Sequence, residues 1–128
     1  MSTEQNKAVL RRWMEGLNTR NVMVIDVLVD EVFTTDFILH ANAQPGYAIG
    51  RGGVKKHVRD VLMEMPDRQF TTFDLFAETD KVVLRASVSG TDASTGESVS
   101  SHAIGIYRFV GTNIAELWQI STETEAKP

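Results

Sequence analysis

The chain has 128 residues, of which 42% are hydrophobic and 23% charged, and this composition is typical of one globular domain spanning residues 1–128. It contains no cysteine, so disulfide frameworks, thiolate nucleophiles and cysteine-ligated metal sites are excluded. The 17 acidic and 13 basic residues give a formal net charge of −4, with no concentrated basic run. We therefore expect no nucleic-acid partner, because neutralising phosphates requires such a basic surface.

The sequence predicts no targeting or membrane segment. The first residues, MSTEQNK, lack the basic-then-apolar pattern of a secretory signal. The longest apolar run, Val22 to Val29, is short and is interrupted by Asp26, so it does not predict a membrane span. We expect a cytoplasmic protein that does not associate with membranes.

Two helices are predicted at the start of the chain. Ser2 or Thr3 can cap the first, and apolar residues then recur at helical spacing as far as Leu17. Asn21 can cap a short second helix with its own apolar stripe. Both helices should therefore bury one face against a common core.

The segment from Thr34 to Ala41 alternates with period two and predicts a strand. One face of it would carry Asp36, His40 and Asn42, a set that suits the wall of a pocket better than a core. The alternative is structural, with Asp36 at the exposed end of the strand and His40 as a half-buried, hydrogen-bonded histidine. Residues 43–53 are rich in glycine and predict a loop, in which Tyr47 can act as a pocket lid.

A third helix is predicted from about Gly53 to Met65, where Pro66 and Asp67 end it. His57 shares its apolar side, and a single histidine there is more often structural than a ligand. Four antiparallel strands should follow, over residues 68–78, 81–91, 99–110 and 113–121, with a bulge expected between Phe70 and Phe73.

The last two of these strands form a hairpin around Gly111-Thr112 that is apolar on both faces. If Val110 pairs with Asn113 without interruption, Tyr107 and Trp118 share one face and His102 lies on the other. A sheet that is apolar on both faces should be covered on both. We expect helices over one face and a second copy of the chain over the other.

The order of elements predicts an α+β fold, in which three N-terminal helices pack in the curl of a bent antiparallel or mixed sheet. Such a curl leaves a cone whose far end the backbone cannot fill, so a cavity is expected.

Several segments, in their order and spacing, also carry a family resemblance over Asn6 to about Thr122. They are NKAVLRRWMEGLNTRN, the strand DFILH, the helix ending in Met65-Pro66-Asp67, and the hairpins AETDKVVLRASVSGT and GIYRFVGTNIAELW. Together they resemble the SnoaL-like polyketide cyclases of the nuclear transport factor 2-like superfamily. The resemblance implies a single SnoaL-like domain with the shape of an α+β barrel, a hydrophobic pocket, pairing through the sheet, and in some members an aldol ring closure without cofactor.

The resemblance also bears on the site. Cyclase-like members carry an acid/base Asp four residues after the tryptophan of the last strand, and Thr122 stands there in this chain. A threonine hydroxyl cannot act as a base near neutral pH. His40 and His102 resemble pocket-facing histidines of the family, and Asp92 replaces a histidine often found after the Gly-Thr of the middle hairpin.

Three hypotheses remain open from the sequence. The first is a cofactor-independent enzyme acting on a small hydrophobic carbonyl compound, with His40 and His102 as acid and base. The second is a non-catalytic binding protein with the same pocket, and the third is a dimerisation module. The residues assigned to contact the small molecule in the first two hypotheses are Asp36, Tyr47, Tyr107, Trp118 and Thr122. No metal site is predicted, because His40, His57 and His102 lie on different elements without ligand spacing.

Overall fold

The computed structural model describes residues 2–42 and 44–123, with backbone alone for residues 44, 45 and 123. The described chain begins with two helices, two strands and a third helix, and four strands follow. The elements are α1 Thr3–Asn18, α2 Val22–Val32, β1 Phe33–Ala41, β2 Gln44–Ile49, α3 Gly50–Glu64, β3 Gln69–Glu78, β4 Lys81–Thr91, β5 Ser98–Val110 and β6 Asn113–Glu123. None of the described helices is long and apolar enough to cross a membrane.

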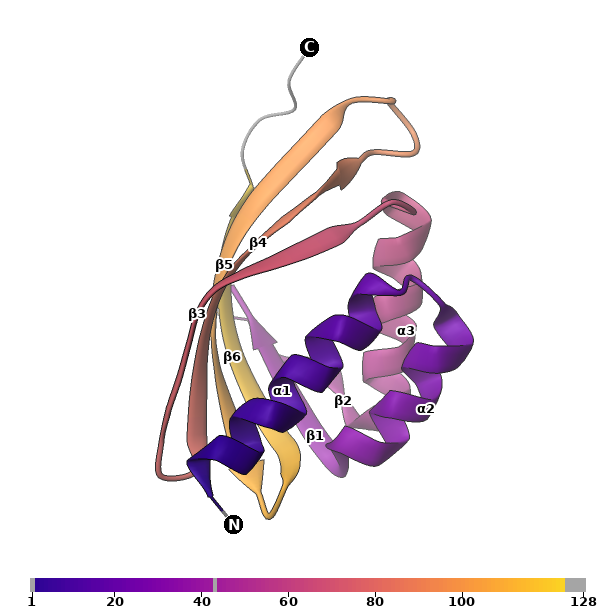
Figure 1. Cartoon of the computed structure of the whole chain (residues 1–128). Coiled ribbons are helices and arrows are strands. Elements are labelled where there is room, and N and C mark those ends of the chain that lie inside the picture. The colour runs from indigo at the N-terminus through magenta and orange to yellow at the C-terminus, as the bar shows by residue number, and fades with distance from the viewer. Residues whose placement is uncertain (1, 43, 124–128) are drawn as a thin grey trace.

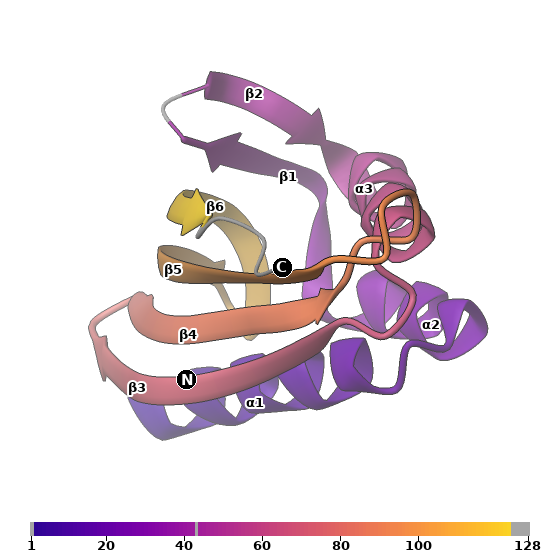
Figure 2. The same cartoon turned by 90° about the horizontal axis from the view of Figure 1, so that it is seen from above.

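The six strands form one curved sheet in the order β2-β1-β6-β5-β4-β3. β1 runs parallel to β6, and every other neighbouring pair is antiparallel. The sheet bends around the helices without closing on itself, so β2 and β3 remain edges (Figures 1 and 2). This confirms the predicted α+β class and the cone formed by three helices inside a bent sheet.

Local signals in the sequence set the helix starts. The Ser2 side chain accepts a hydrogen bond from the Gln5 amide at 3.1 Å, and the Gln5 side chain accepts one from the Ser2 amide at 2.9 Å, which is a capping box. Asn21 caps α2 by accepting from the amides of Met23 and Val24. Both predicted caps are therefore confirmed.

The predicted loop over residues 43–53 is wrong in its extent. The stretch Gln44–Ile49 is a strand, with Ile49 opposite Ile38 and Ala48 opposite Leu39, and α3 begins at Gly50. Glycine and proline led to the loop interpretation, but an edge strand tolerates proline because one side of its backbone needs no partner. Gly50 has a φ of +73°, which lets the chain turn directly from strand to helix.

Two bulges fix which side chains face the helices. The predicted irregularity in β3 is confirmed as a register shift between Thr72 and Asp74. The hairpin pairs Val110 with Asn113 as predicted, but Arg108 then lies opposite Glu116, which leaves one extra residue in β6. Since an extra residue reverses the facing of everything beyond it, Leu117 rather than Trp118 shares the face of Tyr107.

The core lies between the concave face of the sheet and the helices. Trp13 of α1 packs edge-to-face on Phe33 with ring centroids 4.8 Å apart, and Phe33 packs likewise on Phe37 at 4.7 Å. Leu10 and Val29 are completely buried beside them. This aromatic row fills the narrow part of the cone.

Candidate functional site

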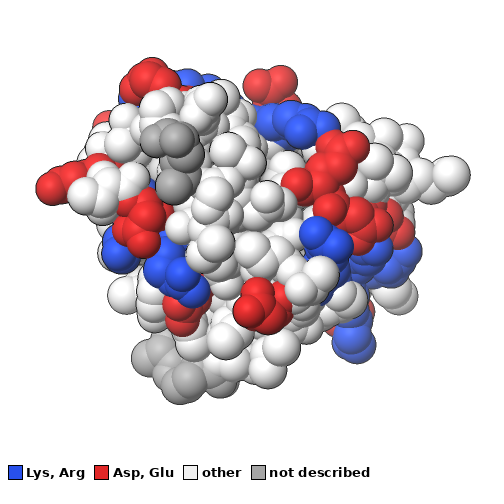
Figure 3. All heavy atoms as spheres, turned by 90° about the horizontal axis from the view of Figure 1, so that it is seen from below, with Lys and Arg blue, Asp and Glu red and all other residues white. Residues whose placement is uncertain are grey.

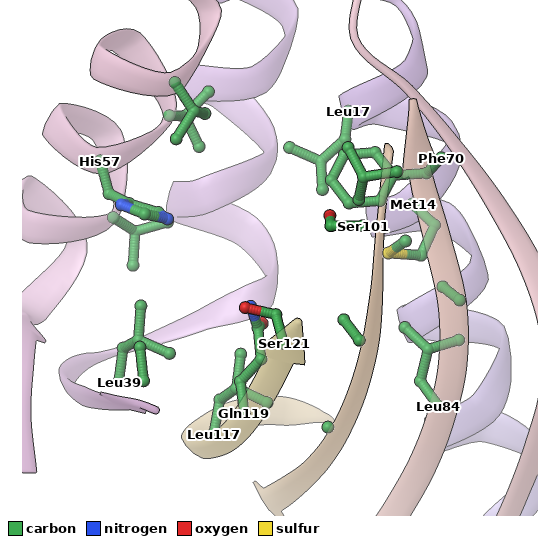
Figure 4. Close-up of a pocket in the computed structure, with 18 of the residues that line it drawn as sticks. Met14, Leu17, Leu39, His57, Phe70, Leu84, Ser101, Leu117, Gln119 and Ser121 are labelled. Carbon is green, nitrogen blue, oxygen red and sulfur yellow. The ribbon is translucent and has the colours of Figure 1, made fainter. Parts of the chain in front are cut away.

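A cavity of about 420 Å³ occupies the wide part of the cone, within the usual size range of small-molecule sites. Side chains from α1 and α3 and from β1, β3, β4, β5 and β6 form its wall, and Tyr47 of β2 contributes at one side. Figure 4 shows Met14, Leu17, Leu39, Leu84 and Leu117 projecting into it from opposite sides. The concave face of the sheet is therefore hollow toward one end.

The cavity changes from apolar to polar along the strands. Its deep part lies at Tyr107, which is opposite Leu117 in the ladder, and its outer part lies at Ala103, which is opposite Ser121. Gln119 lies between these levels. A ligand with an apolar body would therefore find apolar wall at the deep end and amide or hydroxyl groups further out.

Gly105 lies on the cavity side of β5, where the absence of a side chain leaves open space. A Cβ at this position would lie 3.0 Å from Leu117 Cδ1 and 3.1 Å from Tyr107 Cε1, closer than side chains normally pack. Glycine is thus the residue that leaves space above this part of β5.

His57 of α3 is the imidazole in the cavity wall. It is half-buried, and its ring meets that of Tyr47 edge-to-face with centroids 5.5 Å apart. Burial lowers its pKa, the charge of Arg68 lowers it further, and Asp60 raises it. No hydrogen bond joins His57 to any side chain that the structure describes. Its ring points into the cavity toward the side where Gln119 and Ser121 project (Figure 4), so a mostly neutral imidazole with free nitrogen faces the space.

The rim between α3 and β3 carries charge. Glu64 is exposed at the end of α3, and half-buried Arg68 follows just after the helix; both line the cavity. Across the opening, the Asn42 carboxamide oxygen accepts from the Ser121 amide at 2.8 Å. The rim is therefore polar while the floor is apolar.

The prediction that His40 faces the pocket is wrong, because the apolar residues Phe37 and Leu39 take the concave side of β1. His40 lies on the convex face with Nε2 2.7 Å from Glu116 Oε2, and its Nδ1 accepts from the Gly46 amide at 3.2 Å. This matches the structural alternative for His40, in which the ring is half-buried and hydrogen-bonded. Asp36 is exposed and does not line the cavity.

His102 lies on the convex face because its neighbours in β5, Ser101 and Ala103, line the cavity, and Trp118 and Thr122 lie there because of the bulge in β6. Without the extra residue in β6, Trp118 would have joined Tyr107 inside, whereas it stacks on the outer His40 with ring centroids 5.7 Å apart. His102 lies opposite Thr122 and stacks near Phe73 at 6.4 Å. The residue of β5 that lies level with His40 in the ladder is four positions from His102. Four residues of a strand span about 13 Å, so the two histidines are well separated.

Of the residues predicted to contact a ligand, Tyr47 and Tyr107 line the cavity. Sequence reasoning overlooked Gln119, Ser121 and Arg68. The signal in the sequence for the two β6 residues was the consecutive apolar pair Ile114-Ala115, because two adjacent apolar residues interrupt the alternation of a strand and indicate a bulge; both are buried in the structure. Arg68 had no such signal, because a single arginine beside a proline turn looks like ordinary surface.

The site shows no metal-binding cluster within the described ranges, where no three His, Asp or Glu side chains gather. On the face of the molecule in Figure 3, acidic and basic side chains are interspersed among uncharged surface. That face therefore offers no broad patch of one sign.

Comparisons with known proteins address the family. A family model for SnoaL-like polyketide cyclase matches residues 7–126. Among curated proteins, none matches the chain in sequence.

Solved structures with the same fold include three bacterial proteins. A candidate SnoaL-like polyketide cyclase from Jannaschia sp. CCS1 has a TM-score of 0.85 at 13% identity, covering 93% of this chain and 86% of its own. AclR, a candidate hydroxylase from Streptomyces galilaeus, has a TM-score of 0.80 at 22% identity, covering 94% and 91%. IdmH, a candidate polyketide cyclase from Streptomyces antibioticus, has a TM-score of 0.77 at 21% identity, covering 91% of each chain.

Proposed function

The chain belongs to the SnoaL-like polyketide cyclase family, and from this premise and the cavity we propose that it binds a small hydrophobic carbonyl compound and promotes its cyclisation or isomerisation without a cofactor. The observation that carries the proposal is the free imidazole of His57 on the wall of an otherwise apolar cavity. The described reactions of the structural neighbours differ, so the fold itself does not fix the reaction.

His57 is the group suited to act as the base. Its lowered pKa keeps it neutral near pH 7, so a ring nitrogen can accept a proton from a carbon next to a carbonyl. The electron pair left behind forms an enolate, whose carbon attacks a second carbonyl and closes the ring. The proton on His57 then passes to the new alkoxide oxygen. The Gln119 carboxamide and the Ser121 hydroxyl supply hydrogen-bond donors in the same cavity for the developing negative charge.

A second candidate is a binding protein without catalysis. It is favoured by the chemistry of β6, where the residues facing the cavity are Leu117, Gln119 and Ser121, none of which can act as a base near neutral pH. The position at which the family resemblance places an acid/base Asp, Thr122, lies on the convex face.

The test is a turnover screen with small 1,3-dicarbonyl and aromatic polyketide-like compounds. A positioned general base contributes about 10²–10⁴-fold, so His57→Gln should lower turnover by that factor. His40→Gln is the matched control, because its imidazole lies on the convex face, and it should leave turnover nearly unchanged. Wild-type activity should also fall with acidification through a pKa below the ordinary 6.5 of histidine, since protonation removes the base.

Two results would count against this assignment. Turnover that survives in His57→Gln would exclude the imidazole as base. Ligand binding without turnover in any wild-type assay would favour the binding protein.

We also propose that two copies pair through the convex face. Large apolar side chains stay exposed there and neighbour one another in the ladder, among them Ile104 at 53%, Trp118 at 38% and Ile120 at 67% exposure. Contiguous exposed apolar surface of this kind is typical of interaction sites. An interface of standard size would bury about 1,600 Å² in total.

Sedimentation analysis tests the pairing. The wild type should sediment with about twice the mass of the 14.2 kDa chain, and Ile104→Lys should yield a folded monomer. A wild-type monomer at micromolar concentration would exclude the pairing.

A further inference from the structure

Arg68 differs from the other half-buried arginines of the described chain. Arg51 donates to the Phe33 carbonyl at 3.0 Å, and Arg108 donates to the Glu116 carboxylate at 3.1 Å. The Arg68 guanidinium makes no hydrogen bond or ion pair with the described residues. A guanidinium removed from water normally has a partner, because leaving a charge unpaired costs free energy.

The surroundings of Arg68 are held in place. Its guanidinium carbon lies 4.7 Å from the centre of the Phe70 ring, and Phe70 itself lines the cavity. Asn18 fixes the Phe70 backbone by donating to its carbonyl at 3.1 Å and accepting from its amide at 2.8 Å. Arg20 donates to the Arg68 carbonyl. The cation therefore rests on a supported aromatic surface rather than on a mobile loop.

The neighbouring carboxylates do not neutralise it. Asp67 accepts from the Thr91 amide at 2.7 Å, and exposed Glu64 influences the guanidinium only through its charge, without an ion pair within 4.0 Å. Burial lowers the pKa of Arg68, although a guanidinium remains protonated at any physiological pH. The positive charge also acts on His57, another residue of the cavity wall, and lowers the imidazole pKa.

We infer that the ligand of this cavity carries a carboxylate, which the Arg68 guanidinium binds at the rim while the apolar body of the ligand fills the floor. The inference rests on the proposed small-molecule function and specifies its ligand class. A guanidinium presents parallel N–H donors that match the two oxygens of a carboxylate, so the preference should be strong and directional.

The experiment compares two ligands of nearly equal shape, 2-naphthoate and 2-naphthamide, by calorimetry near neutral pH. A hydrogen bond to a charged group contributes about 1.5–3 kcal/mol, so wild type should bind the carboxylate about 10- to 100-fold more tightly than the amide. Arg68→Met should bring this ratio close to one. Arg11→Met is the matched control, because Arg11 is exposed on α1 and does not line the cavity, and it should keep the wild-type ratio.

A second variant covers the case in which Arg68→Met does not fold. Arg68→Lys keeps the charge but loses the forked donors, so it should retain only part of the preference. Glu64→Gln removes the competing negative charge at the rim and should raise the affinity for the carboxylate but not for the amide.

The outcomes separate the two proposals. Equal binding of both probes by wild type, or an unchanged ratio in Arg68→Met or in Arg68→Lys, would overturn the carboxylate inference and leave the cavity as a binding site. Failure of wild type to bind either probe would overturn the proposed function and this inference with it.

Discussion

The two faces of the curved sheet differ in whether their charged side chains have partners within the protein. On the convex face, two groups of charged side chains are paired: Arg85 with Asp74 at 2.5 Å, and Glu116 with both His40 and Arg108. In the cavity on the concave face, His57 and Arg68 have no hydrogen-bond or ion-pair partner among the described side chains. Side chains that are hydrogen-bonded or ion-paired within the protein have no need of another partner, whereas unpaired side chains in a cavity are available to bind a ligand. The difference indicates that binding chemistry belongs to the concave face and assembly to the convex face.

The largest expected effect concerns the core beneath the cavity. Trp13→Ala should lower the free energy of unfolding by about 3–5 kcal/mol, because removing a buried indole leaves space that the sheet cannot close. Arg12→Ala, the neighbouring exposed position, loses only an ion pair with Glu31 and should change it by about 0.5 kcal/mol. Chemical denaturation measures both, and equal midpoints would mean that α1 presents a different face to the core.

A smaller effect separates the two faces of one strand. Gly105→Ala places a methyl group against Leu117 and Tyr107 and should destabilise the protein by about 1–3 kcal/mol. Ile104→Ala removes a half-exposed side chain on the opposite face and should cost the isolated protomer less than about 1 kcal/mol. Thermal unfolding at low protein concentration gives the comparison, and a reversed order would contradict the assigned facing of β5.

The smallest effect tests the paired charges of the convex face. The hydrogen bond from His40 holds the pKa of Glu116 below its usual value, with Arg108 adding to this effect. A carboxyl group whose pKa is lowered by folding stabilises the protein above its unfolded pKa, and the stabilisation disappears as the pH falls through the folded pKa. Glu116→Gln should therefore be less stable than wild type by about 0.2–1 kcal/mol near neutral pH.

On acidification below about pH 4.3, the ordinary pKa of glutamate, the two proteins should converge in stability. A gap that stays constant from pH 7 to pH 3 would show that Glu116 contributes through packing rather than through its charge.

Much of the fold follows from local pattern in the sequence. Capping at Ser2 and Asn21, the helix end at Pro66 and the bulge in β3 are all written in short stretches of residues, and each is confirmed. The edge strand β2 was not predictable in the same way, because its glycine and proline content indicates a loop unless the partner strand β1 is already in place.

The site was harder to predict because facing depends on single residues. Because β6 has one extra residue, Leu117 faces the cavity instead of Trp118, and Ser121 faces it instead of Thr122. In β1 the apolar residues Phe37 and Leu39 face the core, so His40 faces the opposite side of the sheet. A hydrophobic pattern says that one face of a strand is buried, but it does not say whether a polar residue nearby lines a cavity or pairs on the surface.

The two tryptophans offer one reporter for each face, since Trp13 lines the cavity and Trp118 lies on the convex face. The most direct measurement is to follow both indole N–H signals by NMR, at fixed protein concentration, during titration with 2-naphthoate. We predict that the Trp13 signal shifts to saturation while the Trp118 signal stays in place. A shift of Trp118 with Trp13 unchanged, or no shift of either, would contradict the assignment of ligand binding to the concave face.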